Sequence, residues 1–224
     1  MSRTLSEVFD DTRSHDRAAL IGYLPAGFPD ARRAVELITD MVAAGVDIVE
    51  VGLPYSDPLM DGPDIQAAVD QALTAGATPD VVLDTVAQVV AAGATALVMS
   101  YWNPIERYGT DRFADRMASA GGAGVITPDL TPEEAGAWIS ATDRTGLDRV
   151  FLVAPSSTDQ RIETVAAVTS GFLYAASTMG VTGARTQVSS AAPGLVRRAR
   201  ALTDLPIAVG LGVSTGDQAS EVAA

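Results

Sequence analysis

The sequence contains no cysteine and no lysine, and His15 is its only histidine. Without cysteine the chain has no disulfide and no thiolate nucleophile. Without lysine it cannot form an imine with a carbonyl substrate or with pyridoxal phosphate. One histidine in a polar segment excludes a histidine-rich metal site and a histidine-based catalytic triad. Acid–base chemistry at neutral pH must therefore fall largely to aspartate and glutamate.

Long apolar runs and an excess of basic residues are also missing. No run reaches the roughly 18 apolar residues that a membrane-spanning helix needs. The formal net charge of −13 argues against a general basic surface for nucleic acid. The first residues are polar and charged, unlike a secretory signal. Together with the lack of cysteine, these features predict a cytoplasmic enzyme.

Short apolar runs alternate with longer amphipathic or alanine-rich stretches along the chain. The apolar runs predict strands at 19–24, 47–51, 96–101, 124–127, 149–153, 171–175 and 207–210. The stretches between them predict helices at 30–44, 65–76, 79–92, 111–120, 132–142, 159–169 and 189–202, with another that starts near Thr215. Continuous apolar strands separated by helices are typical of a parallel sheet covered on both faces, so we expect an α/β fold.

Two architectures fit this alternation: a doubly wound open sheet and a closed (β/α)8 TIM barrel. A dinucleotide-binding sheet needs G-x-G-x-x-G after its first strand, whereas here that strand leads into Leu-Pro-Ala-Gly-Phe-Pro. Polar and glycine-rich motifs follow the first, second, third, sixth and seventh strands, which favours a barrel with its site at the carboxyl ends of the strands. Seven strands are predicted. We therefore expect residues 1–224 to form a single, C-terminally truncated barrel domain without the eighth strand and helix.

The strongest candidate for chemistry is Glu50 with the loop that follows it. Glu50 lies within an apolar strand and points opposite to Val49 and Val51, so one of these two faces meets the helical shell and the other meets the barrel interior. A buried carboxylate is costly unless it is paired, protonated or useful, although a satisfied structural glutamate is the alternative. Asp61 follows on a loop rich in proline and glycine, where it could also be an ordinary turn or capping residue.

Two glycine-rich turns, at 180–185 and 210–215, follow the last two predicted strands. Turns of this kind at the start of a helix present free backbone amides to a phosphate. Each turn alone is more often only a tight turn. Their common place on late barrel loops indicates a phosphate site.

Four motifs, in this order and at this spacing, resemble the tryptophan synthase α family. They are Glu50 with its Ser-Asp-Pro and Asp-Gly-Pro loop, Tyr101-Trp102-Asn103-Pro104, Tyr174 ahead of Gly-Val-Thr-Gly, and Gly-Leu-Gly-Val-Ser. The resemblance implies a lyase of tryptophan biosynthesis that splits indole-3-glycerol phosphate into indole and glyceraldehyde 3-phosphate. It also implies an α2β2 assembly with a separate β subunit. That subunit carries pyridoxal phosphate, so no cofactor or metal is expected on this chain.

The resemblance also implies roles for individual residues. Glu50 would be the acid–base group that protonates the indole ring at C3, and Asp61 would contact the indole N–H and stabilise positive charge there. Further residues would bind substrate: Tyr23, Met99, Tyr101, Ile126 and Leu152 around the indole, Tyr174 near the reacting end, Thr182 closing against Asp61, and Gly183 and Gly212 at the phosphate.

The chemistry agrees with the composition. Retro-aldol cleavage needs an electron sink, and protonation at C3 turns the indole ring itself into one. Two carboxylates then suffice, and the Glu50 pKa should be raised by desolvation. The alternatives are a stand-alone indole-3-glycerol phosphate lyase and a non-catalytic subunit that binds and activates a β chain. A phosphosugar isomerase fits poorly because the chain offers no obvious histidine electrophile.

Overall fold

The computed structural model describes residues 3–176, 192–210, 213 and 215–223. Its strands are β1 (Ile21–Pro25), β2 (Ile48–Gly52), β3 (Thr95–Met99), β4 (Gly124–Ile126), β5 (Asp148–Val150), β6 (Leu152–Val153), β7 (Leu173–Ala176) and β8 (Ile207–Gly210). Its helices are α1 (Leu5–Ser14), α2 (Ala31–Ala43), α3 (Pro63–Thr74), α4 (Pro79–Ala91), α5 (Trp102–Tyr108), α6 (Thr110–Ser119), α7 (Gly136–Thr145), α8 (Asp159–Val168), α9 (Ala192–Arg200) and α10 (Gly216–Ala223).

All strand pairs are parallel, and neighbours in the sequence are neighbours in space. The order is β1-β2-β3-β4-β5 in one ladder and β6-β7-β8 in the other. The ladders meet at Phe151, because β5 pairs with β4 while β6, just beyond it, pairs with β7. β5 and β6 therefore fill one barrel position, as the single predicted strand at 149–153 requires. Within the described residues, no strand is paired with the outer edge of β1 or of β8.

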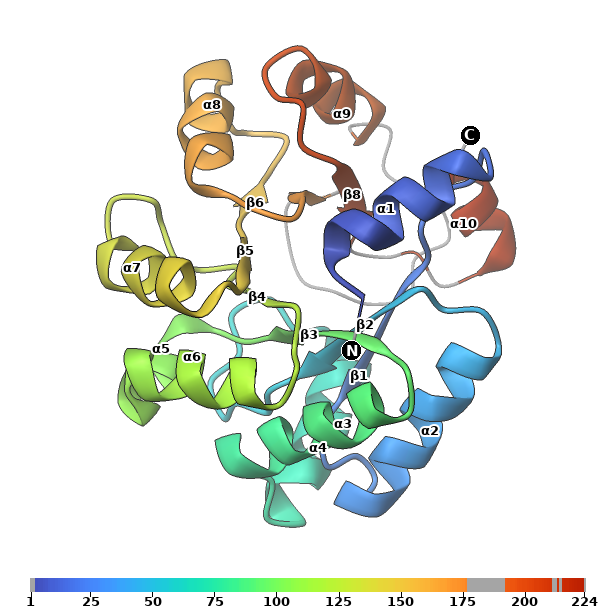
Figure 1. Ribbon diagram of the computed structural model, residues 1–224, viewed down its shortest axis with the longest axis vertical. Coiled ribbons are helices and arrows are strands. Elements are labelled where there is room, and N and C mark those ends of the chain that lie inside the picture. Colours follow the sequence, from blue (N-terminus) through green and yellow to red (C-terminus); the bar gives the residue numbers. More distant parts are fainter. Residues whose placement is uncertain (1–2, 177–191, 211–212, 214, 224) are drawn as a thin grey trace.

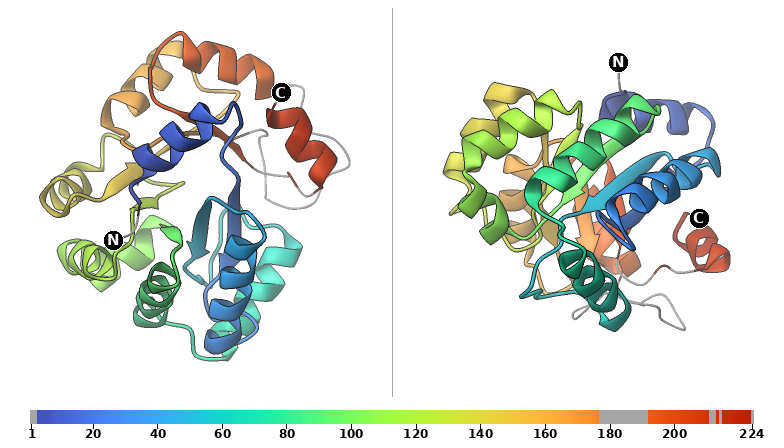
Figure 2. Two further views of the ribbon diagram at one scale, coloured as in Figure 1. Left: turned by 45° about the vertical axis from the view of Figure 1, so that its right-hand side comes forward. Right: turned by 90° about the horizontal axis from the view of Figure 1, so that it is seen from below.

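The helices form an outer ring around the strands, and the two turned views agree with this arrangement (Figures 1 and 2). Alternation along the strands divides the core into two layers. Val49 and Val51 of β2 belong to the outer layer between strands and helices, while Ile48 belongs to the interior. The same interior cluster includes Leu97, Ile126 and other inward residues of the following strands. The parallel α/β barrel predicted from the sequence is the observed architecture.

Helix α1 was not predicted, because its segment is polar and charged. Thr4 and Glu7 form a capping box at its start, and its apolar residues Leu5 and Val8 are buried in the barrel interior. In Figure 1 α1 lies inside the ring of helices. It therefore closes one end of the barrel and leaves the opposite end for the site.

Three helices begin directly after a capping side chain. Asp30, Thr78 and Thr158 each accept a backbone N–H of the first turn at α2, α4 and α8. The helix predicted from residue 132 is a correction, because turns lead into α7, which begins at Gly136. Helix α5 was missed. No helix in the described part of the chain combines the length and apolarity needed to cross a membrane.

Candidate active site

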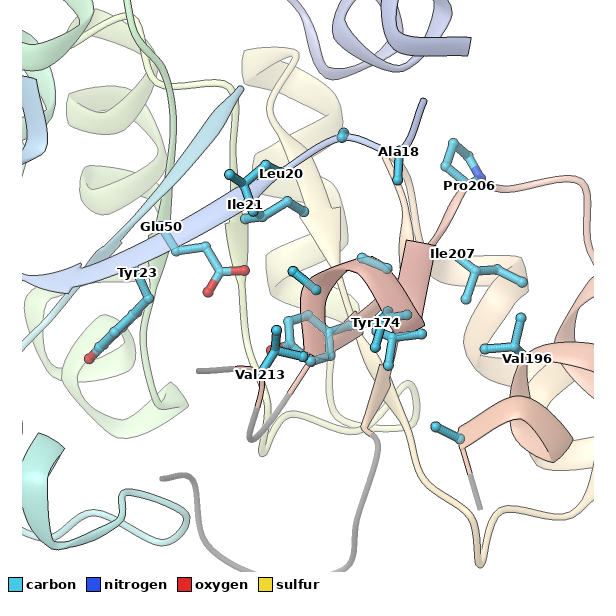
Figure 3. Close-up of a pocket in the computed structure, with 18 of the residues that line it drawn as sticks. Ala18, Leu20, Ile21, Tyr23, Glu50, Tyr174, Val196, Pro206, Ile207 and Val213 are labelled. Atoms are coloured by element: carbon cyan, nitrogen blue, oxygen red, sulfur yellow. The ribbon is translucent and has the colours of Figure 1, made fainter. Parts of the chain in front are cut away.

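Glu50 lies in the middle of β2 and points into the barrel. Its Cα partner on β1 is Tyr23, and both neighbours of Glu50 along the strand point to the outer layer. Only 7% of the Glu50 surface is exposed. In Figure 3 its carboxylate extends from β2 into the cavity, between Tyr23 and Tyr174. The direction predicted from strand alternation is confirmed.

The surroundings of Glu50 hold its proton tightly. No described residue makes a hydrogen bond or ion pair with the carboxylate, and burial raises its pKa to about 7. Burial disfavours the charged form because the barrel interior cannot replace the water that would solvate it. Glu50 is therefore a carboxyl group that gains and loses a proton near neutral pH, as general acid–base work requires.

Asp61 lies between β2 and α3, and Tyr101, the residue that precedes α5, holds it. The Tyr101 hydroxyl donates to Asp61 Oδ1 at 2.7 Å and accepts the backbone N–H of Met60 at 2.9 Å. Burial raises the pKa of Asp61, and the bond from Tyr101 opposes that rise. Among the described residues, the side chain that orients the Asp61 carboxylate from outside its own loop is Tyr101.

Two tyrosines narrow the cavity on either side of Glu50, and each lies over a glycine. A Cβ atom at Gly52 would lie 2.4 Å from the Tyr23 hydroxyl oxygen. A Cβ atom at Gly210 would lie 1.9 Å from the Tyr174 hydroxyl oxygen. Burial, followed by the nearby carboxylate charges, raises the pKa of both phenols, so they remain neutral donors. The glycines at the ends of β2 and β8 thus make room for the rings.

A cavity of about 1280 Å³ joins these groups. It extends from the Asp61 loop to Phe9 and Arg13 of α1, along the free edges of β1 and β8. Of the residues predicted for the site, those on its wall are Tyr23, Glu50, Asp61, Met99, Tyr101 and Tyr174. Ile126 and Leu152 lie in the interior cluster rather than on the wall. The predicted residues Thr182, Gly183 and Gly212 lie outside the described residues.

Sequence reasoning missed Asp129, which comes directly after Pro128 in the loop that follows β4. Its Oδ1 accepts the backbone N–H of Trp102 at 2.9 Å. The signal was the polar segment Thr127-Pro128-Asp129 at the carboxyl end of a predicted strand. Motifs were recognised there after other strands, but not after this one.

Comparison with known proteins gives this geometry a family. Residues 9–224 match the family model described as "Tryptophan synthase alpha chain". The chain belongs to the tryptophan synthase alpha chain family. A relative from Thermobifida fusca, named as such a chain, is 59% identical over 95% of this chain and 80% of its own length. Another from Mycobacteroides abscessus is 57% identical over 98% of this chain and 84% of its own.

Solved structures agree in fold. The structure of Mycobacterium tuberculosis tryptophan synthase matches with a TM-score of 0.93 and 52% identity, covering 99% of this chain and 85% of that one. A tryptophan synthase subunit alpha from Legionella pneumophila matches with a TM-score of 0.88 at 30% identity. The predicted family, TIM-barrel class and lyase function in tryptophan biosynthesis are therefore confirmed. The roles of single residues are not decided by these comparisons.

Proposed function

We propose that this chain cleaves indole-3-glycerol phosphate to indole and glyceraldehyde 3-phosphate with Glu50 as its acid–base group and Asp61 as its charge-stabilising group. The observation that carries the proposal is the isolated, buried carboxyl of Glu50, whose pKa lies at about 7. A second carboxylate, Asp61, lies on the wall of the same cavity and accepts a hydrogen bond from Tyr101.

The reaction needs one proton to enter and one to leave. Protonated Glu50 gives its proton to C3 of the indole ring, which leaves positive charge at the ring nitrogen. Ionised Asp61 accepts the ring N–H and stabilises that charge. The Glu50 carboxylate then takes the proton of the hydroxyl on the adjacent glycerol carbon. The bond between that carbon and C3 breaks, its electron pair returns to the ring, and the aldehyde leaves. Glu50 ends the cycle protonated, as it began.

The rest of the pocket fits an aromatic substrate with a charged tail. Tyr23, Met99 and Tyr101 line the cavity beside the carboxylates and offer apolar surface to an indole ring. We assign Tyr174 to the reacting end, and Ile126 and Leu152 to the layer that supports the indole pocket from within the barrel. Thr182, Gly183 and Gly212 are proposed to close the site and to bind the phosphate.

The proposal extends to assembly and location. We propose a single barrel domain over residues 1–224, which works in the cytoplasm with a tryptophan synthase β subunit in an α2β2 complex. Asp57 and Pro58, both on the loop after β2, are proposed to face that partner. Pyridoxal phosphate belongs to the β subunit, since this chain has no lysine to hold it as an imine.

The experiment is to measure indole release from indole-3-glycerol phosphate by the chain, with and without the β subunit. Glu50→Gln should bind glycerol 3-phosphate as the parent does but lose at least about 10²-fold in turnover. Glu163→Gln, on the exposed face of α8, is the matched control and should be unaffected. Near-parental turnover by Glu50→Gln would overturn the mechanism. A parent that releases no indole in either condition, yet activates the β subunit, would establish the non-catalytic alternative.

A further inference from the structure

Asp129 is a half-buried carboxylate at the active-site end of the barrel, and the proposed reaction gives it no task. It follows β4, and burial raises its pKa, opposed by the N–H groups that it accepts. Its Oδ1 accepts the backbone N–H of Trp102 at 2.9 Å. Burying a carboxylate costs free energy unless hydrogen bonds or a function compensate for it.

The contact fixes the backbone beside Tyr101. Trp102 is the first residue of α5, and Tyr101 comes directly before it. On the other side, the Ser100 N–H donates to the Ile126 carbonyl at 3.0 Å, so β4 and the loop after it hold both neighbours of Tyr101. The Tyr101 side chain is itself buried, with 7% exposed, and its ring lies 5.8 Å from that of Tyr55.

The Tyr101 hydroxyl holds Asp61. It donates to Asp61 Oδ1 and accepts the Met60 N–H, so it ties down both the side chain and the backbone of the loop after β2. A chain of contacts thus runs from the β4 loop, through the start of α5, to the loop after β2. Each link is a hydrogen bond of ordinary length.

We infer that Asp129 is a positioning residue for the lyase reaction: by holding the Trp102 N–H it sets Tyr101, and through the Tyr101 hydroxyl it sets the orientation of Asp61. The inference rests on the proposed role of Asp61. Pro128 lies on the cavity wall, whereas Asp129, the next residue, does not. The competing explanation is that Asp129 only caps the start of α5.

A double-mutant cycle separates the two explanations, because groups that act through one another are not additive. Asp129→Ala and Tyr101→Phe should each lower kcat/KM by about 10-fold, a modest share of a positioned group's usual effect. The double variant should be no worse than Tyr101→Phe alone, within about twofold, because the link is already cut. Asp129→Asn keeps an oxygen acceptor and should recover most of the activity. Asp148→Ala removes a carboxyl of similar burial from the opposite end of the barrel and is the control.

Two further measurements exclude a merely structural effect. Thermal melting should show that both single variants remain folded at the temperature of the assay, so that their loss of turnover is not a loss of folded protein. The acid limb of the kcat/KM profile should move upward in both variants, because the Tyr101 hydroxyl opposes the rise of the Asp61 pKa. If Asp129→Ala does not fold, Asp129→Ser, too short to reach Trp102, takes its place in the cycle.

The inference would be overturned if the double variant lost kcat/KM by the product of the two single losses. It would also be overturned if Asp129→Ala left the acid limb of the pH profile in place or turned over substrate as fast as the parent. Failure of the proposed function looks different. In that case the parent itself would release no indole, or Glu50→Gln and Asp61→Asn would be as active as the parent. A parent that needs Glu50 and Asp61 but tolerates Asp129→Ala leaves the function standing and removes only the role of Asp129.

Discussion

Glu50 on β2 and Asp61 on the following loop are two carboxyl groups that line one cavity, but different parts of the fold fix their positions. Glu50 sits in a five-residue strand that is buried throughout, and burial alone accounts for its raised pKa. Asp61 sits on a partly exposed loop, and the hydroxyl of Tyr101, which precedes α5, restrains it. The fold therefore sets Glu50 directly, whereas Asp61 depends on its neighbours. Distant changes should disturb the second group and spare the first.

The difference also divides the chemistry. Burial raises the pKa of both groups, but at Asp61 the hydrogen bond from Tyr101 favours the anion and opposes the rise. Pairs of carboxyl groups whose environments separate their pKa values are how one site supplies both an acid and an anion.

The largest expected effect is on stability. Glu50 has a folded pKa of about 7 against an ordinary value of 4.5, so the folded state binds the proton more tightly. Stability from this group is therefore lost as the pH rises from 4.5 to 7, and the cost is fully present above 7, at about 3 kcal/mol. Glu50→Gln should raise the free energy of unfolding by about that amount at pH 8.

Denaturant unfolding at pH 8 and pH 5 measures this difference, since the gain should shrink at the lower pH. Asp61→Asn, which is half-buried and already bonded, should change stability by less than about 1 kcal/mol at either pH. Equal effects of the two substitutions would contradict the distinction between a carboxylate held by the fold and one held by a neighbour.

The second prediction concerns the ring over the end of β2. Gly52→Ala places a Cβ atom 2.4 Å from the Tyr23 hydroxyl oxygen, so the ring must move. The crowding should cost about 1–3 kcal/mol in thermal or denaturant unfolding, and turnover should fall with it. Tyr23→Ala in the same chain should relieve the crowding. Gly136→Ala is the control, because nothing lies near its Cβ position, and it should be close to neutral.

The smallest expected effect is a shift of one limb of the pH profile. The reaction needs Asp61 ionised and Glu50 protonated, so kcat/KM should be bell-shaped, with its alkaline limb near pH 7. Tyr101→Phe removes the bond that lowers the Asp61 pKa, so the acid limb should move upward. The alkaline limb should stay in place. Movement of both limbs together would mean that the two carboxylates titrate as one coupled pair.

Most of the barrel could be predicted from the sequence, because the periodicities of strands and helices are local signals. All of the predicted strands are present, and alternation placed Glu50 and Val51 on opposite faces of β2. Helix α1 was not predicted, because its apolar residues are few and pack against strands that are distant in the sequence. The start of α7 was predicted too early, because the Thr-Pro-Glu segment before it forms turns rather than the first turn of the helix.

The site was predictable only where a residue's own strand decides its direction. The hydrogen bond from Tyr101 to Asp61 joins residues 40 positions apart, and no local pattern specifies it. The packing of Tyr23 over Gly52 depends on the register of β1 against β2. The contact of Asp129 with Trp102 likewise joins two loops. These relations arise from the packing of neighbouring strands and loops and therefore needed the structure.

The central claim is that Glu50 is a carboxyl group whose proton the barrel interior retains up to neutral pH. The most direct measurement is a carbon-13 NMR titration of the glutamate side-chain carboxyls, with Glu50→Gln used to assign the Glu50 resonance. The account predicts a midpoint near pH 7 for that resonance, with the exposed glutamates titrating at lower pH. A Glu50 midpoint near the ordinary value of 4.5 would contradict it.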